Sequence, residues 1–387
     1  MIVESGSTGR SQRFLVFMFV AVLLGCTNTV AKDPESSPAD ALIGALALRE
    51  SATPARAHPR WAPAERIVVV VPKFFLAAAP DMLDRLARVA GEAEIVTVDS
   101  SQTTPADFTG ADVIIGACAP GLARSAELRW VHSYAVGVEK CVPAFRAMAS
   151  PPMLTNGQRL TGPNIAEHTI AMMMALKANL HRFYAQQLEQ EWRPNLPGVG
   201  LKREVAGSTM LVVGLGGIGT EVARRAAGLG MRVIATRNSS RQGPDFVDYV
   251  GLSNELTELA GEADVIVNAL PLTPATENLF DAEFFAAAKR GALFISVGRG
   301  RSTDHDALVA ALASGQIGGA GLDVTEPEPL PADSPLWQMP NVIITPHTSG
   351  WPSVEAIRRI AILLEENLRR YVAGDALLNV VDIERGY

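Results

Sequence analysis

The fold is decided by the stretch VVGLGGIGTEVA, residues 212–223. The apolar run Met210–Val213 predicts a buried strand before the glycines, and the apolar spacing of Ile218–Leu229 predicts a helix after them. Gly214, Gly216 and Gly219 match the pattern GxGxxG in the strand-to-helix context that gives this pattern its meaning. Such a loop makes a tight turn, lets the backbone approach a pyrophosphate, and packs the helix close to the strand. The stretch therefore predicts a doubly wound domain that binds a dinucleotide through this loop, with Gly217 and Ile218 opening the helix whose N-terminus faces the anion.

The next strand indicates which dinucleotide is bound. A carboxylate usually follows that strand, roughly 20 residues after the glycines, and binds the ribose 2′-hydroxyl. Here Arg237 stands at that place, followed by Asn238 and Ser239. An arginine favours a 2′-phosphate, so we predict NADP(H) rather than NAD(H). The alternative is that Arg237 is solvated and stacks on the adenine without a phosphate preference.

The rest of the chain alternates strands and helices, which predicts parallel sheets with right-handed crossovers. Short strands at 67–71, 94–98, 113–115 and 129–132, with a helix at 81–90, form a first series, and a second series runs from 209 to 345. One long apolar helix, 164–187, is predicted between them, with its methionines in core or subunit packing rather than in a ligand site. The predicted fold class is α/β with two doubly wound, Rossmann-like domains. The boundaries are 66–163 plus 349–387 for a substrate domain and 164–348 for a dinucleotide-binding domain.

The N-terminus reads as a targeting segment rather than part of the fold. Arg10 and Arg13 precede an apolar run, 14–25, which has the length of a signal-peptide core. The run ends in LLGC, so residues 1–26 resemble a bacterial lipoprotein signal that would leave Cys26 to carry lipid. Residues 27–65 are predicted to be a flexible tether with a short helix at 41–49. A genuine signal implies a membrane-anchored or periplasmic protein; a wrongly assigned start implies a cytoplasmic one, and an uncleaved anchor is a further alternative.

Composition and cysteine spacing exclude several classes of partner. Lys plus Arg number 34 and Asp plus Glu 41, for a net charge of −7, and no strongly basic run appears, so we expect no nucleic-acid partner. No cysteine pair or His/Cys cluster has metal-ligand spacing, so we expect no metal site. We predict that Cys118 and Cys141 are buried thiols. Their pairing is the alternative in an oxidising compartment.

Three further motifs follow the glycine loop in a fixed order. Arg299 lies in GRG, Glu328 in DVTEPEP, and His347 in TPHTSG. A guanidinium offers paired donors to a planar carboxylate and stays charged. A histidine can deliver a proton to a keto oxygen and take it back. A carboxylate can orient that imidazole and favour its charged form.

These motifs, with LPLTPAT at 270–276, resemble the D-isomer-specific 2-hydroxyacid dehydrogenases over residues 66–381. The resemblance implies an active site in a cleft between the two domains. It implies that Arg299 binds the substrate carboxylate, His347 is the acid/base and Glu328 its partner, with Glu326 the competitor for that role. The remaining residues implied by the resemblance are Val136 and Gly137 for the substrate carboxylate, and Leu270, Pro271, Thr273 and Asp323 for the cofactor.

The resemblance also implies a small 2-keto or 2-hydroxy acid substrate, with glyoxylate or hydroxypyruvate favoured, and a homodimer. The sequence departs from the family in three places. Ser296 stands where the family often has asparagine, so we expect looser support of the Arg299 loop, and Ser302 and Thr303 are polar where the family is usually apolar, so we expect different packing beneath that loop. His305 stands where an acidic residue is common. A catalytically weak nucleotide sensor on the same fold is the alternative function. An export signal conflicts with NADP(H) chemistry, because soluble NADP(H) is scarce outside the cytoplasm.

Overall fold

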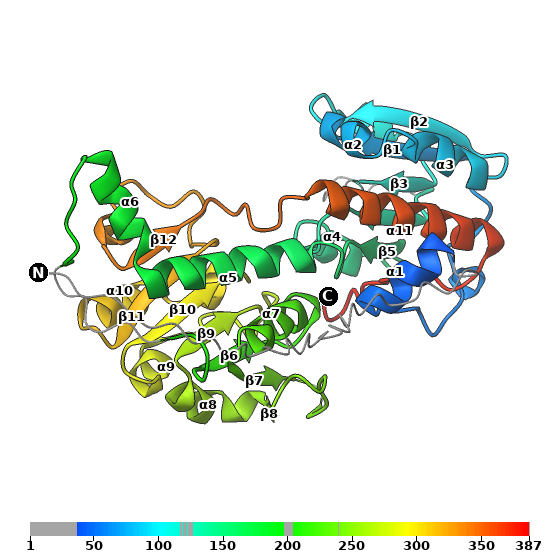
Figure 1. Cartoon of the computed structure of the whole chain (residues 1–387). Helices are drawn as coiled ribbons and strands as arrows, with labels where there is room; N and C mark the ends of the chain where they lie inside the picture. Colours follow the sequence, from blue (N-terminus) through cyan, green and yellow to red (C-terminus); the bar gives the residue numbers. More distant parts are fainter. Residues whose placement is uncertain are drawn as a thin grey trace, which may run out of the picture. The chain divides into compact units, whose positions relative to one another are not determined.

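The computed structural model describes residues 37–116, 118, 122, 127–196, 204–238 and 240–386. From Ser37 onward the chain forms one compact unit. Within the described residues it contains two parallel sheets, one of five strands and one of seven. The expected fold class is therefore confirmed (Figure 1).

The first sheet has the strand order β2-β1-β3-β4-β5. Its interior strand β1 is a run of β-branched residues and is buried on both faces, as a parallel strand between helices must be. The aromatic residues Trp130 and Tyr371 stack in the core of this sheet, with ring centroids 5.3 Å apart. The elements of this sheet are β1 (Arg66–Val71), β2 (Glu94–Asp99), β3 (Val113–Ile115), β4 (Trp130–Ser133), β5 (Met153–Asn156), α2 (Lys73–Ala78), α3 (Met82–Val89), α4 (Val142–Arg146) and α11 (Val354–Ala373).

The second sheet has the order β12-β11-β10-β9-β6-β7-β8. The chain moves outward from β6 through β7 to β8, then returns to β9 on the other side of β6. This reversal makes the carboxyl ends of β6 and β9 the switch point where ligands bind in such sheets. The strands are β6 (Thr209–Val213), β7 (Arg232–Arg237), β8 (Tyr249–Leu252), β9 (Val265–Asn268), β10 (Ala292–Ser296), β11 (Ile317–Leu322) and β12 (Val342–Ile344). The helices are α5 (Gly162–Ala178), α6 (Leu180–Leu188), α7 (Gly217–Gly228), α8 (Leu256–Glu262), α9 (Ala282–Ala287) and α10 (His305–Ala313).

The single helix predicted over 164–187 is wrong in one respect. Asn179 adopts a left-handed conformation with φ 55° and divides the segment into α5 and α6. Asparagine tolerates this conformation better than most residues, so it can end one helix and open the next. Met172 and Met173 are buried in the core of the second sheet, as expected, whereas Met174 is partly exposed.

The tether predicted for 27–65 is also wrong over its described part, 37–65. This part contains α1 (Pro38–Leu46), close to the short helix expected at 41–49, and buries Leu42, Leu48 and Ala55 in the core of the first sheet. In Figure 1, α1 (blue) lies beside α11 (red), and the two helices are in contact. The apolar side chains of this Ala- and Pro-rich segment therefore pack against the core of the first sheet. Composition alone could not predict this packing.

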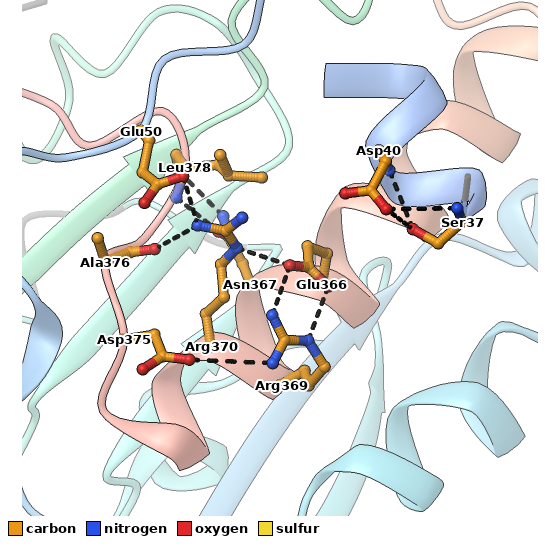
Figure 2. A network of polar contacts seen from close by, with 10 residues as sticks. All are labelled: Ser37, Asp40, Glu50, Glu366, Asn367, Arg369, Arg370, Asp375, Ala376 and Leu378. Carbon is orange, nitrogen blue, oxygen red and sulfur yellow. Dashed lines mark hydrogen bonds and ion pairs between the residues drawn. The ribbon is translucent and has the colours of Figure 1, made fainter. Parts of the chain in front are cut away.

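Polar contacts hold the same segment in place. Figure 2 shows Glu50 reaching Arg370 of α11, with 3.0 Å between Oε2 and Nη1. Arg370 is also paired with Glu366 at 2.6 Å. At the start of the segment, Ser37 and Asp40 cap α1 reciprocally. Residues 1–36, which include Cys26, lie outside the described residues. In the part of the chain that is described, no helix is both long and apolar enough to cross a membrane.

Candidate active site

The glycine loop connects β6 to α7 at the switch point, and its three motif glycines have three different surroundings. Gly214 has φ +95°, which favours glycine, and a Cβ there would lie 3.1 Å from the carbonyl oxygen of Ala269. A Cβ on Gly219 would meet Val212 at 2.9 Å, so this glycine lets α7 pack close to β6. A Cβ on Gly216 would have nothing within 4 Å. The turn, the close packing and the open approach expected for pyrophosphate binding are therefore all present, and the loop fits a dinucleotide.

The start of α7 also has free hydrogen-bond donors. Among the described residues, no acceptor is bonded to the N–H groups of Gly217 or Ile218. These groups, with the positive end of the helix dipole, can bind a phosphate. The loop following β9 borders the same place, because Leu270 packs against Gly214. Within that loop, Pro271 and Thr273 form a turn closed by Thr276, whose hydroxyl donates to the Pro271 carbonyl at 2.8 Å.

Arg237 ends β7 beside the glycine loop. The N–H groups of Gly214 and Leu215 both donate to the carbonyl of Thr236, at 3.3 and 3.1 Å. The half-buried Arg237 donates through Nη1 to the Gln242 carbonyl at 2.7 Å. Asn238 follows it and is exposed, whereas Ser239 lies outside the described residues.

His347 and Glu328 are in direct contact. Nδ1 of His347 lies 2.9 Å from Oε2 of Glu328. A carboxylate can only accept, so Nδ1–H donates and Nε2 is left for another partner. His347 has φ 53°, an uncommon conformation outside glycine, and its backbone N–H donates to the carbonyls of Asp323 and Thr345. The other oxygen of Glu328 accepts from the N–H of Thr325 at 3.1 Å, which fixes the carboxylate.

Asp323 is buried and holds the His347 loop. Its carboxylate accepts the Thr345 hydroxyl at 2.6 Å and the N–H groups of Thr348 and Ser349 at 2.9 and 3.1 Å. His168 of α5 binds the same Thr345 hydroxyl through Nε2 at 2.9 Å. The Asp323 carboxylate therefore holds the 345–349 loop that carries His347, and so it positions the histidine. A contact of Asp323 with the cofactor stays a prediction.

Arg299 lies against the substrate loop expected from the sequence. Its guanidinium occupies the space that a Cβ on Gly137 would need, so the Arg299 side chain lies directly against the backbone of residue 137. Nε of Arg299 forms an ion pair with Oε1 of Glu139 at 3.0 Å. The carbonyl of Val136 accepts a bond from the amide of Asn156 at 2.6 Å, which orients the loop. Among the described residues, no acceptor is bonded to the N–H groups of Val136 and Gly137, so these donors are free beside a guanidinium.

A buried amide beneath the Arg299 loop was missed by sequence reasoning. Asn268, at the end of β9, donates to the hydroxyls of Ser296 and Ser302 at 3.1 and 2.8 Å. The Ser302 hydroxyl in turn donates to the Arg299 carbonyl at 2.6 Å. The looser support expected from Ser296 is therefore wrong, because the small hydroxyls of Ser296 and Ser302 leave room for an amide that ties three segments together. Thr303, which follows Ser302, buries a hydroxyl with no partner in the described part of the chain.

Cys118 and Cys141 form a disulfide, with Cα atoms 5.5 Å apart. The prediction of two separate thiols is therefore wrong. Cys118 follows β3 and Cys141 caps α4, directly after the substrate loop. Parallel strand order brings these two positions together, although 23 residues separate them. No group of three or more His, Cys, Asp or Glu side chains with metal-binding geometry occurs among the residues described.

Comparison with known proteins identifies the family. Residues 170–349 match the D-isomer specific 2-hydroxyacid dehydrogenase, NAD binding domain. The glyoxylate reductase of Korarchaeum cryptofilum is 34% identical over 67% of this chain and 77% of its own length. The glyoxylate/hydroxypyruvate reductase B of Escherichia fergusonii is 35% identical over 61% of this chain and 70% of its own length.

Solved structures agree with these sequence matches. The D-isomer specific 2-hydroxyacid dehydrogenase of Xanthobacter autotrophicus Py2, in complex with NADPH and MES, has a TM-score of 0.69 at 28% identity and covers 84% of this chain and all of its own. The NADPH-dependent glyoxylate/hydroxypyruvate reductase of Sinorhizobium meliloti, in complex with NADP and sulfate, has a TM-score of 0.67 at 29% identity with the same coverage. The chain belongs to the D-isomer specific 2-hydroxyacid dehydrogenases, oxidoreductases that act on a small 2-hydroxy or 2-keto acid with a nicotinamide cofactor.

Proposed function

We propose that this protein is an NADP(H)-dependent reductase of a small 2-keto acid, glyoxylate or hydroxypyruvate, that yields the D-hydroxy acid where the product is chiral. The observation that carries the proposal is the position of Arg299 against Gly137, beside two free backbone N–H groups. A guanidinium and paired N–H donors are the groups that bind a carboxylate. Relatives named for the reduction of glyoxylate and hydroxypyruvate support the choice of substrate class.

Each residue of the site has a separate role in the proposed reduction. Arg299 and the N–H groups of Val136 and Gly137 hold the substrate carboxylate, and Arg299 polarises the keto oxygen. Nε2 of protonated His347 gives its proton to that oxygen, and Glu328 stabilises the charged imidazole and keeps Nδ1 protonated. The glycine loop and the 270–273 loop would hold a reduced nicotinamide cofactor, which would supply the hydride when bound. Glu139, now paired with Arg299, must give way to the substrate carboxylate.

A panel assay tests both parts of the proposal. Initial rates with NADPH and with NADH, each against glyoxylate, hydroxypyruvate, pyruvate and phenylpyruvate, should show the highest kcat/KM for NADPH with one of the first two acids. Equal efficiency with NADH and NADPH would contradict the cofactor assignment. Tight cofactor binding without turnover on any 2-keto acid would favour the nucleotide sensor instead.

The protein is further proposed to be exported and anchored through Cys26, which requires that it retain its cofactor tightly, because soluble NADP(H) is scarce outside the cytoplasm. The lipoprotein-like residues 1–26 and the Cys118–Cys141 disulfide support this location, since disulfides persist in oxidising compartments. Fractionation of cells that express the wild type and the Cys26→Ser variant tests it. Membrane-associated wild type and released variant are expected; a wild type found in the cytosolic fraction would contradict it.

A homodimer is the proposed assembly. Leu180, Tyr184 and Leu188 are spaced by four on α6, and each is more than half exposed. Residues four apart share one face of a helix, so the three form an apolar stripe suited to a second copy. Light scattering should give a dimer for the wild type and a monomer for Leu188→Glu. A monomeric wild type would refute the proposal.

A further inference from the structure

Three arginines from separate segments surround the glycine loop. Arg237 ends β7 on one side of it, where Thr236 accepts bonds from the loop. Arg159, from the turn between β5 and α5, lies against the start of α7, because a Cβ on Gly217 would lie 2.7 Å from Cγ of Arg159. The turn stays close to α7, since a Cβ on Gly162 would lie 3.2 Å from the Gly217 carbonyl oxygen. The two arginines therefore flank the loop expected to hold the cofactor.

Arg49 joins them from the N-terminal segment. Asn379 holds the two segments together, because its N–H donates to the Arg49 carbonyl at 2.7 Å and its amide donates to the Gln158 carbonyl at 2.9 Å. Arg159 itself donates through Nη1 to the carbonyl of Leu46 at the end of α1, at 3.2 Å. Arg49 is exposed and Arg159 half-buried.

The charges of Arg49 and Arg237 act on Arg159. Burial, and next the charges of Arg49 and Arg237, lower the pKa of Arg159 below its ordinary value. Among the described residues, none of the three arginines forms an ion pair. The carboxylate that acts on Arg159 is that of Glu221, and it is bonded to Arg225 at 2.7 Å. Arg159 also has φ +71°, a conformation that would be unstrained only for glycine. An arginine held there against backbone strain, among like charges, is suited to an anion.

We propose that Arg159 and Arg49 bind the 2′-phosphate of the cofactor together with Arg237, so that the N-terminal segment completes the cofactor site. This inference rests on the proposed preference for NADP(H). A phosphate dianion would relieve the repulsion among three cations and accept charge-assisted hydrogen bonds from them. The segment 37–65, which lies outside the two sheets, would then contribute to cofactor choice through Arg49.

Binding measurements without substrate test this inference. The dissociation constants of NADPH and NADH are measured by fluorescence titration for the wild type, Arg159→Gln, Arg49→Gln, Arg237→Gln and Arg159→Lys. Arg88→Gln, an exposed arginine on α3, is the matched control. Arg159→Gln and Arg49→Gln should each weaken NADPH binding by about fivefold to tenfold, which corresponds to about 1 to 1.4 kcal/mol, and leave NADH unchanged. Arg159→Lys should recover part of the loss, and thermal unfolding of each variant shows whether it is folded.

The outcomes separate the two proposals. A wild type that prefers NADPH, with variants at 159 and 49 that bind it equally well, would overturn this inference and leave the cofactor assignment to Arg237. Equal losses for NADPH and NADH would place the arginines on the pyrophosphate and would also overturn it. A wild type with no preference for NADPH would contradict both the NADP(H) assignment in the proposed function and this inference.

Discussion

Nδ1 of His347 lies 2.9 Å from Oε2 of Glu328, and this hydrogen bond leaves Nε2 as the proton donor to substrate. His347→Ala should lower kcat by about 10²-fold to 10⁴-fold, because general acid catalysis contributes that much, and should leave the dissociation constant of NADPH unchanged. Glu328→Gln should lower kcat less, since the amide can still accept from Nδ1 but carries no charge.

The neighbouring Glu326 provides the matched control for that pair. It is exposed, and Glu326→Gln should keep wild-type kcat. Near-wild-type turnover in His347→Ala, or equal losses in the two glutamate variants, would contradict the assignment of the pair. Steady-state rates with NADPH and glyoxylate supply the measurement.

Substitution of Arg299 should mainly weaken substrate binding and so raise KM. Arg299→Lys keeps the charge but loses the paired donors, so KM for the keto acid should rise by about tenfold or more, at the scale of one charge-assisted hydrogen bond. Arg301, an exposed arginine two positions on that pairs with Glu277, is the control, and Arg301→Lys should change KM little. An unchanged KM in Arg299→Lys would argue against carboxylate binding by this side chain.

The hydroxyl network beneath Arg299 should contribute to stability. Ser302→Ala removes an acceptor from Asn268 and a donor from the Arg299 carbonyl, so the free energy of unfolding should fall by about 1 to 3 kcal/mol. Thr303→Val is the contrasting change, because it replaces a buried hydroxyl without a described partner and should be neutral or stabilising. Urea unfolding of both variants measures this, and equal stability of the two would show that the network contributes nothing.

His132 should make the protein less stable in acid. It is buried in β4 with Nδ1 2.8 Å from the Thr155 hydroxyl, and burial lowers its pKa from 6.5 to about 3. Its neutral form is therefore favoured by folding. Stability is fully present above pH 6.5 and falls as pH drops from 6.5 toward 3, because the unfolded chain takes up a proton that the folded chain does not.

The slope from this one group is at most about 1.4 kcal/mol per pH unit. His132→Gln should flatten the pH dependence of the unfolding free energy between pH 6.5 and 4.5, whatever its effect at pH 7.5. Urea unfolding at four pH values measures it. A variant with the wild-type slope would show that His132 is protonated in the folded protein or that other groups dominate.

The Cys118–Cys141 disulfide should stabilise the first sheet. Closing a loop of this length contributes about 3 kcal/mol in the chain-entropy description. Dithiothreitol should therefore lower the midpoint of thermal unfolding of the wild type but not that of the Cys118→Ser/Cys141→Ser variant. A wild type that carries two free thiols by mass spectrometry after purification under oxidising conditions would contradict the bond.

The sequence by itself determined the fold class, because Gly214, Gly216 and Gly219 have local roles that depend only on the strand before them and the helix after them. It also fixed the order of Arg299, Glu328 and His347 and their chemistry. The pairing of His347 with Glu328 was predicted through the family resemblance, and the structure places the two residues after neighbouring parallel strands, β11 and β12.

Only the tertiary structure decided which distant groups meet. Arg299 touches Glu139 and Gly137 because a strand end of one sheet faces a loop of the other, and Asn268 joins Ser296 to Ser302 because β9 and β10 are adjacent. The docking of 37–65 on α11, and with it the place of Arg49 near Arg159, depends on buried apolar side chains whose partner surface is formed by residues far along the chain. Local sequence patterns report the period of an element and the chemistry of a side chain; long-range packing decides which of those side chains share a site.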